Sequence, residues 1–355
     1  MTGYSLQNGY YNWYDCTMMD FSEDNTTFLM ITMRTSLSRT LVILLLLPFV
    51  LHSGWLFAEF EVKTNPQTGH WLILENDKPV VQYYYKTVPL PKGYWEKLTH
   101  GQEYAVPRSD YIHPLFDLDG KSVTCDWAMD HAHHRGIYWA WPEVGYQGEL
   151  ADLHALQKVF ARPNGKIGVF EENDTMTLRA ENFWKWDDEK PIVHETTAIA
   201  VHPLDKDGRK IDLEFRFLGL VEEVTLARRG TEHYGGLNIR MAPLDAFQSG
   251  AFCEENTNSA KPAAWVFGTW NDTASGKKME LTVFEKADNP DYPGEYIQYP
   301  DIQWFQTTFP KKGTRYSLKQ GETLVLRFQL WLHEATFDDA AKKDAWKTYQ
   351  ASPSQ

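Results

Sequence analysis

Four of the 12 histidines in this chain fall in one short stretch: His113, His131, His133 and His134. Imidazole is a metal ligand and a proton carrier near neutral pH, so this clustering points to chemistry. In an extended segment His131 and His133 project to one side and His134 projects to the other. We therefore predict that His131 and His133 bind a divalent metal ion. His113 or Asp126 completes the ligand set, and one position stays open for water or substrate.

The spacing of these histidines is only moderately specific. It matches neither a zinc finger nor the helical His-Glu-x-x-His pattern of metalloproteases. Histidines beside a strand also cap backbone groups or bond to carboxylates, and this structural role is the alternative. The chain has no glycine loop with Rossmann or P-loop spacing, so we expect no nucleotide cofactor. Its net charge of -13 argues against nucleic acid as a partner.

A second polar cluster runs from Glu232 to Met241 and contains two adjacent glycines. If this segment is a strand, Asn238 and Arg240 share a face with Gly236, and the glycines let a ligand approach the backbone closely. Arg240 and Asn238 are then candidates to bind the substrate, and His233 is a further acid–base candidate. An interior ion pair is the alternative for Arg240.

Aromatic residues make up 14% of the chain, which suits a large β core or a cleft that stacks on sugar rings. Packing is the commoner use. Trp139 and Trp141 follow the histidines, and Trp304 follows the Pro- and Gly-rich segment 288–296. These three tryptophans are the candidates for sugar stacking, and covering a sheet edge is the alternative for the aromatic loop.

Strict alternation of apolar and polar residues indicates half-buried strands over 176–180, 210–217, 279–283 and 324–332. Asn-Gly, Asp-Gly and Lys-Gly pairs between such runs favour hairpins, and no β-α-β alternation is present. One helix is predicted, over 337–349. We predict an all-β fold: residues 59–355 form a single two-sheet antiparallel β-sandwich domain with a short C-terminal helix, of which a galactose-mutarotase-like supersandwich is one form.

A basic segment and a short apolar run begin at Met33, in the pattern of a signal peptide. We predict a signal peptide over 33–58, cleaved after Ala58, and a periplasmic or secreted protein that does not contact the membrane after cleavage. A transmembrane anchor is the alternative, but the apolar run is shorter than the roughly 20 residues that a bilayer requires. Residues 1–32 are acidic and lack Lys and Arg, so we interpret them as a mis-called N-terminal extension.

Five motifs in the remaining chain together resemble a family that is usually labelled "methane oxygenase PmoA-like" or left as a domain of unknown function. They are Tyr-Ile-His-Pro-Leu at 111–115, His-Ala-His-His-Arg-Gly at 131–136, Gly-Gly-Leu-Asn-Ile-Arg at 235–240, Ala-Trp-Val at 264–266 and Asn-Pro-Asp-Tyr-Pro at 289–293. The family usually has Pro where this chain has Ala132. The resemblance implies an exported bacterial protein in a carbohydrate setting, since such proteins are often encoded near sugar oxidoreductases and keto-sugar hydrolases.

The clusters and this resemblance predict a carbohydrate-active enzyme of the glycoside hydrolase or lyase type, with a keto-sugar as one substrate class. In this hypothesis a divalent ion polarises a carbonyl or hydroxyl group of the sugar. His134 moves the proton, and Arg135 with Arg240 orients the sugar. The predicted metal ligands are His113, His131 and His133.

Two other functions fit the same residues. In the first, the chain is a non-catalytic carbohydrate-binding β-sandwich, in which tryptophans stack on sugar rings and histidines bond only to hydroxyl groups. In the second, it is a metal-dependent oxidoreductase, as the family label implies, and it holds redox-active copper or iron. Metal analysis separates the second alternative from the others.

Overall fold

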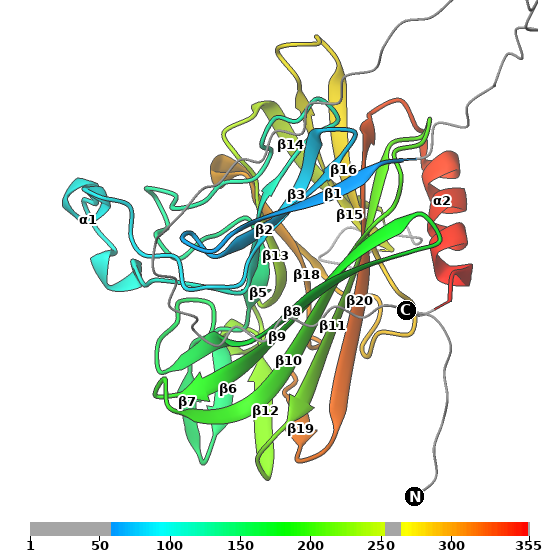
Figure 1. The fold of residues 1–355 in the computed structure, drawn as a ribbon. Coiled ribbons are helices and arrows are strands. Elements are labelled where there is room, and N and C mark those ends of the chain that lie inside the picture. Colours follow the sequence, from blue (N-terminus) through cyan, green and yellow to red (C-terminus); the bar gives the residue numbers. More distant parts are fainter. Residues whose placement is uncertain (1–57, 253–263, 354–355) are drawn as a thin grey trace, which may run out of the picture. The chain divides into compact units, whose positions relative to one another are not determined.

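The computed structural model describes residues 58–252 and 264–353, and most of these residues lie in antiparallel strands (Figure 1). The predicted N-terminal extension, 1–32, and the predicted signal peptide up to residue 57 lie outside the described residues. Within the described part of the chain, no helix is long and apolar enough to cross a membrane.

The first of two eight-stranded sheets carries the chemistry-bearing segments. Its strands lie in the order β1, β2, β3, β4, β5, β13, β18 and β17. In that order, their bounds are Phe60–Asn65, His70–Glu75, Lys78–Tyr84, Tyr111–Leu115, Ile137–Ala140, Gly236–Arg240, Trp304–Thr308 and Tyr296–Tyr299.

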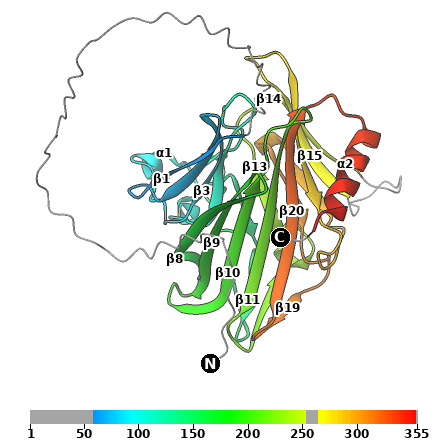
Figure 2. The same ribbon diagram turned by 45° about the vertical axis from the view of Figure 1, so that its right-hand side comes forward.

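The second eight-stranded sheet has the order β14, β15, β16, β20, β11, β10, β9 and β8. In that order, their bounds are Asp245–Phe252, Trp265–Asn271, Lys278–Glu285, Thr323–Glu334, Arg209–Gly219, Lys190–Val201, Thr175–Trp186 and Val159–Glu172. Figure 2 shows β8 to β11 and β20 side by side.

A smaller third sheet has the order β19, β12, β6 and β7. The strands are Tyr316–Lys319, Glu223–Ala227, Glu143–Tyr146 and Glu149–Ala151. The described chain also contains two α-helices, the single turn α1 at Tyr94–Lys97 and the C-terminal helix α2 at Asp339–Ala351. Three short 3₁₀ helices lie at Gln102–Tyr104, Arg229–Thr231 and Pro300–Ile302.

All four strands predicted from alternation belong to the second sheet, as β9, β11, β16 and β20. In β11, Ile211, Leu213 and Phe217 are almost wholly buried, and Leu213 lies opposite Phe328 of β20. These side chains form one apolar core with residues of the first sheet such as Trp139. The predicted all-β antiparallel fold with a short C-terminal helix is confirmed, and the third sheet adds to the two that were predicted.

Helix α2 begins at Asp339, because the side chain of Asp338 accepts a hydrogen bond from the Ala341 N–H at 2.8 Å and caps the first turn. The helix lies alongside the second sheet in both views (Figures 1 and 2). Tyr349 packs there with Phe284 and Trp331. The helix therefore covers apolar side chains of β16 and β20.

A buried polar network joins the two large sheets. Tyr83 on β3 donates a hydrogen bond to Asp110 Oδ1 at 2.7 Å, and Asn182 on β9 donates to the same oxygen at 2.9 Å. Trp184 donates to Glu195 Oε2 at 2.6 Å. Burial, together with the nearby Asp110 carboxylate, raises the pKa of Glu195 well above its ordinary range. The buried site therefore favours the protonated, neutral form of Glu195.

This protonation makes stability depend on pH. The folded pKa of Glu195 lies above the ordinary value of 4.5, so its contribution to stability is full below that value and is lost as pH rises towards the folded pKa. The Glu195→Gln variant has no carboxyl group to titrate here. As pH rises, the unfolding free energy of the variant should therefore fall less steeply than that of the wild type. The two slopes should differ by up to about 1.4 kcal/mol for each pH unit. Urea unfolding between about pH 5 and pH 9, with the exposed Glu172→Gln as control, measures it, and parallel profiles for wild type and Glu195→Gln would refute it.

Candidate functional site

A cavity of about 790 Å³ lies where three polar segments singled out from the sequence meet. The reason is strand order: β13 pairs with β5 on one side and with β18 on the other, and Arg240 at the end of β13 lies opposite Trp304 at the start of β18. The histidine segment directly precedes β5. The lining residues are Tyr104, His131, His133, His134, Asp152, His154, Ala155, Gln157, Arg229, Tyr234, Tyr299, Pro300, Asp301, Ile302 and Trp304.

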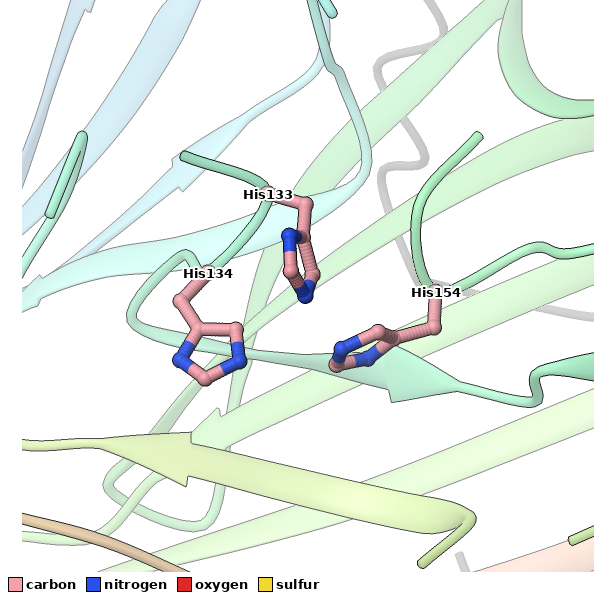
Figure 3. Close-up of side chains that lie close together, drawn as sticks. All are labelled: His133, His134 and His154. Atoms are coloured by element: carbon pink, nitrogen blue, oxygen red, sulfur yellow. The ribbon is translucent and has the colours of Figure 1, made fainter. Parts of the chain in front are cut away.

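Three imidazoles converge on this cavity. The ligand atoms of His133, His134 and His154 lie within 4.8 Å of one another, and Figure 3 shows one nitrogen of each ring pointing into the space between the rings. They come from two segments, 131–135 before β5 and 152–157 between β7 and β8, which we call the histidine loops.

His154 was not among the residues predicted from the sequence. It lies 20 residues beyond the histidine cluster, in a stretch without other histidines, and only the fold brings it to the others. The peptide N–H of Leu153 donates to the Trp141 carbonyl at 3.0 Å, which ties the second histidine loop to the end of β5. The His154 Nδ1 atom lies 3.5 Å from the Tyr138 hydroxyl, so its Nε2 atom faces the other rings.

The expectation that His131 and His133 project together, away from His134, is wrong. It assumed an extended chain, but the His134 N–H donates to the His131 carbonyl at 2.9 Å and the segment forms a turn. His133 and His134 consequently both face His154. The half-exposed ring of His131 stacks on His134 at 4.6 Å and also lines the cavity.

The structure does not bring His113 to these rings. His113 lies on β4, where its Nδ1 atom is 3.0 Å from the Thr124 hydroxyl, and it is not among the residues that line the cavity. The set His113, His131 and His133 predicted from spacing is therefore not assembled around one point. His133 and His154 meet there instead.

The neighbours of His134 determine which of its ring nitrogens carries the proton. Arg240 Nη1 lies 3.4 Å from His134 Nδ1, and Arg240 Nη2 donates to both carboxylate oxygens of Asp130 at 2.8 Å. A guanidinium group only donates, so Nδ1 is the acceptor and the proton is on Nε2. Burial, followed by the neighbouring histidines and arginines, lowers the pKa of His134 well below its ordinary range. His134 is a neutral ring whose N–H points toward the cavity.

His133 is held neutral with its lone pair available. Burial, followed by the charges of His131 and nearby arginines, lowers the pKa of His133 to about 3. Its Nδ1 atom is buried and has no hydrogen-bond partner among the described residues, which leaves Nε2 to face the other rings. Burial also lowers the pKa of His154. Neutral imidazole is the form that binds a metal ion or accepts a proton.

His154 fits a divalent ion better than His134 does, and, among the described residues, His133 presents a free Nε2 beside it. Nitrogen ligands about 2.0–2.1 Å from a tetrahedral zinc ion lie roughly 3.3 Å apart, so a separation of up to 4.8 Å requires only a small inward movement of the rings. A metal-bound histidine normally donates its other N–H to an acceptor. His154 has the Tyr138 hydroxyl for this role, whereas His134 faces a guanidinium donor.

Six of the other predicted site residues do not line the cavity. Arg240, predicted to bind substrate, instead forms an ion pair with Asp130 at 2.8 Å. Arg135 is fully buried behind the first histidine loop. Trp139 stacks on Trp141 at 4.6 Å in the apolar core. Asn238 is buried and donates to the Gly236 carbonyl at 2.9 Å, and His233 is exposed to solvent.

Aromatic rings form much of the remaining wall. Trp304, predicted to bind substrate, lies nearly parallel to the His134 ring at 5.9 Å. Tyr299 contacts Trp304 at 5.1 Å and is 46% exposed. Tyr104 lies 5.2 Å from His133 on the opposite flank. Such rings, with one polar end and one apolar face, suit a ligand that carries both hydroxyl groups and C–H faces.

Lining charges are mostly paired. Arg229 Nη2 donates to Asp152 Oδ2 at 2.5 Å, and Asp152 also accepts from the Ala155 N–H at 2.8 Å. Asp152 therefore holds the second histidine loop and Arg229 together. Asp301 is an exposed carboxylate in the lining.

Several solved structures are similar to this chain at low identity. A polysaccharide lyase aligns with TM-score 0.33 and 10% identity over 81% of this chain and 34% of the lyase. An alpha-galactosidase from Lactobacillus brevis aligns with TM-score 0.37 and 12% identity over 78% of this chain and 39% of the galactosidase. A galactose mutarotase related enzyme from Lactobacillus acidophilus aligns with TM-score 0.34 and 9% identity over 79% of this chain and 99% of that protein.

The chain thus spans well under half the length of the lyase and the galactosidase that it matches. No curated protein matches it. The PmoA-like resemblance stays a prediction, because the family model that matches carries a different description. That model covers residues 71–347, and the chain belongs to the family it describes, a family of unknown function (DUF6807).

Proposed function

We propose that this chain is a carbohydrate-active enzyme that cleaves a glycosidic linkage by metal-assisted acid–base chemistry, as a hydrolase or a lyase. One observation carries the proposal: three neutral imidazoles, His133, His134 and His154, meet in a cavity with aromatic walls. Nitrogen ligands that approach one point suit a divalent ion, and aromatic faces suit a sugar ring.

His133 and His154 are the proposed metal ligands, and His131 lines the same cavity with its ring centre 5.9 Å from that of His133. A divalent ion at this place supplies Lewis acidity toward a sugar hydroxyl or carbonyl oxygen. Two imidazole ligands would leave the other coordination positions of such an ion open for substrate or water. This ligand set replaces His113 with His154.

His134 is proposed to donate a hydrogen bond from Nε2 to the oxygen on which negative charge develops. A neutral imidazole N–H is a competent electrophile of this kind. Arg240 holds the opposite nitrogen as an acceptor and so keeps the proton on the cavity side. Elimination next to a sugar carbonyl, as in a keto-sugar, makes the greatest use of such a donor.

Export of the protein is part of the same proposal. The basic and apolar pattern of 33–58 and the PmoA-like motifs support a signal peptide and a periplasmic or secreted enzyme. When the gene is expressed in a bacterial host, the protein recovered from the periplasm should begin at Glu59. N-terminal sequencing checks this. Retention in the cytoplasm with residues 33–58 uncleaved would count against export.

Metal binding depends on His154 and does not depend on His113. The purified protein, reconstituted with zinc and analysed for metal after gel filtration, should hold close to one ion. His133→Ala and His154→Ala should lose it, because each removes one of the two proposed ligands. His113→Ala is the matched control and should retain the ion. Loss in His113→Ala with retention in His154→Ala, or no ion in the wild type, would contradict this ligand set.

Sugar binding depends on the exposed ring of Tyr299. Tyr299→Ala should weaken glycoside binding about 2- to 12-fold, the equivalent of about 0.5–1.5 kcal/mol for an aromatic contact. Tyr299→Phe keeps the ring and should bind like the wild type. The measurement is calorimetry on a panel of glycosides, followed by assays for reducing ends and for unsaturated products. Binding without turnover would favour the non-catalytic alternative, and native copper or iron would favour the oxidoreductase.

A further inference from the structure

Two buried arginines lie directly behind the histidine loops, and neither lines the cavity. Arg135 is 0% exposed and Arg108 is 3% exposed. A guanidinium group that cannot touch a ligand and is removed from water is costly to retain. Its contacts therefore show what it does for the site.

The side chain of Arg135 donates hydrogen bonds to the backbone of the first histidine loop. Its Nη1 atom donates to the Ala132 carbonyl at 2.7 Å, in the peptide plane before His133, and to the His134 carbonyl at 2.8 Å, in the peptide plane after His134. The guanidinium is itself fixed, since Nε lies 3.1 Å from Asp126 and the group stacks 3.5 Å above the Trp127 ring. The peptide planes before and after the His133–His134 pair are consequently held in one orientation.

Arg108 does the same for the second histidine loop. Its Nη1 atom donates to the His154 carbonyl at 2.8 Å, and its Nη2 atom donates to the Leu153 and Trp139 carbonyls at 3.1 Å. In the described part of the chain its hydrogen bonds all go to carbonyl oxygens. The group also lies 4.5 Å over the ring of Tyr138, whose hydroxyl faces His154.

We infer that Arg108 and Arg135 are positioning residues that set the relative placement of the proposed ligands His133 and His154 for metal binding, an inference that rests on the proposed metal site. Fixed peptide planes beside a histidine fix the Cα–Cβ bond from which its imidazole extends. The planar fork of arginine can hold two or three carbonyls at once. A lysine ammonium on a flexible stem cannot reproduce that geometry.

The experiment uses cobalt(II) as the probe, because its visible absorption reports ligand number and geometry as well as affinity. Full-length wild type, Arg135→Lys and Arg108→Lys are titrated with cobalt, and folding is checked by circular dichroism and thermal melting. The matched control is Arg209→Lys, a buried arginine outside the cavity that donates to the His202 carbonyl and pairs with Glu75. It controls for the general cost of replacing a buried arginine.

Both site variants should bind cobalt about 10- to 100-fold more weakly than the wild type and with an altered visible spectrum. The control should lose thermal stability yet keep the affinity and spectrum of the wild type. Unchanged affinity and spectrum in both site variants would overturn the inference and leave the proposed metal site standing. If the wild type binds no cobalt, the proposed metal site fails and the inference fails with it. If Arg135→Lys does not fold, Arg108→Lys decides the question by the same readout.

Discussion

Backbone carbonyls that are buried beside a cavity must find donors inside the protein, and this constraint shapes the site more than any other. In the second histidine loop a single bridge between Asp152 and Gln157 satisfies the carbonyls of those two residues, and the carbonyls of Leu153 and His154 between them need other donors. Arg108 and Arg135 supply the donors, with five hydrogen bonds of 2.7 to 3.1 Å to the carbonyls of the loops and of Trp139. Burial lowers the pKa of His133 most, and the charges of His131 and of these two arginines lower it further. The arginines therefore hold the loop geometry and also favour the neutral state of His133.

The strand order of the first sheet decides which side chains meet. β5, β13 and β18 are neighbours, so the turn before β5, the end of β13 and the start of β18 share one edge. Arg240 and Trp304 face each other there, and each contacts His134, one at its Nδ1 atom and one across its ring face. A single pairing thus sets both the tautomer of His134 and the aromatic wall beside it.

Much of the fold was readable from the sequence, whereas the site was readable only in part. Alternation found strands whose one face is buried, as in β11, because period two is a local signal. The cluster containing His133 and His134 could also be recognised, because its residues are close together in the sequence. His154 could not, since a lone histidine acquires meaning only from a contact between segments distant in sequence. Trp139 and Arg135 were predicted as site residues but lie in the protein interior, because residue type does not reveal whether a side chain faces a core or a cavity.

His133 and His154 belong to different loops, and the second loop is attached to the body of the protein through Trp141 and Arg108. An unfolded chain offers no such pair, so the binding free energy of an ion at this place adds to the free energy of folding. At about 100 times the dissociation constant this linkage is worth about 2.7 kcal/mol. Such an ion would bind only after both loops have reached their places in the folded chain, and it would stabilise only that state. The metal concentration in the compartment where the chain folds would then determine how long the folded state persists.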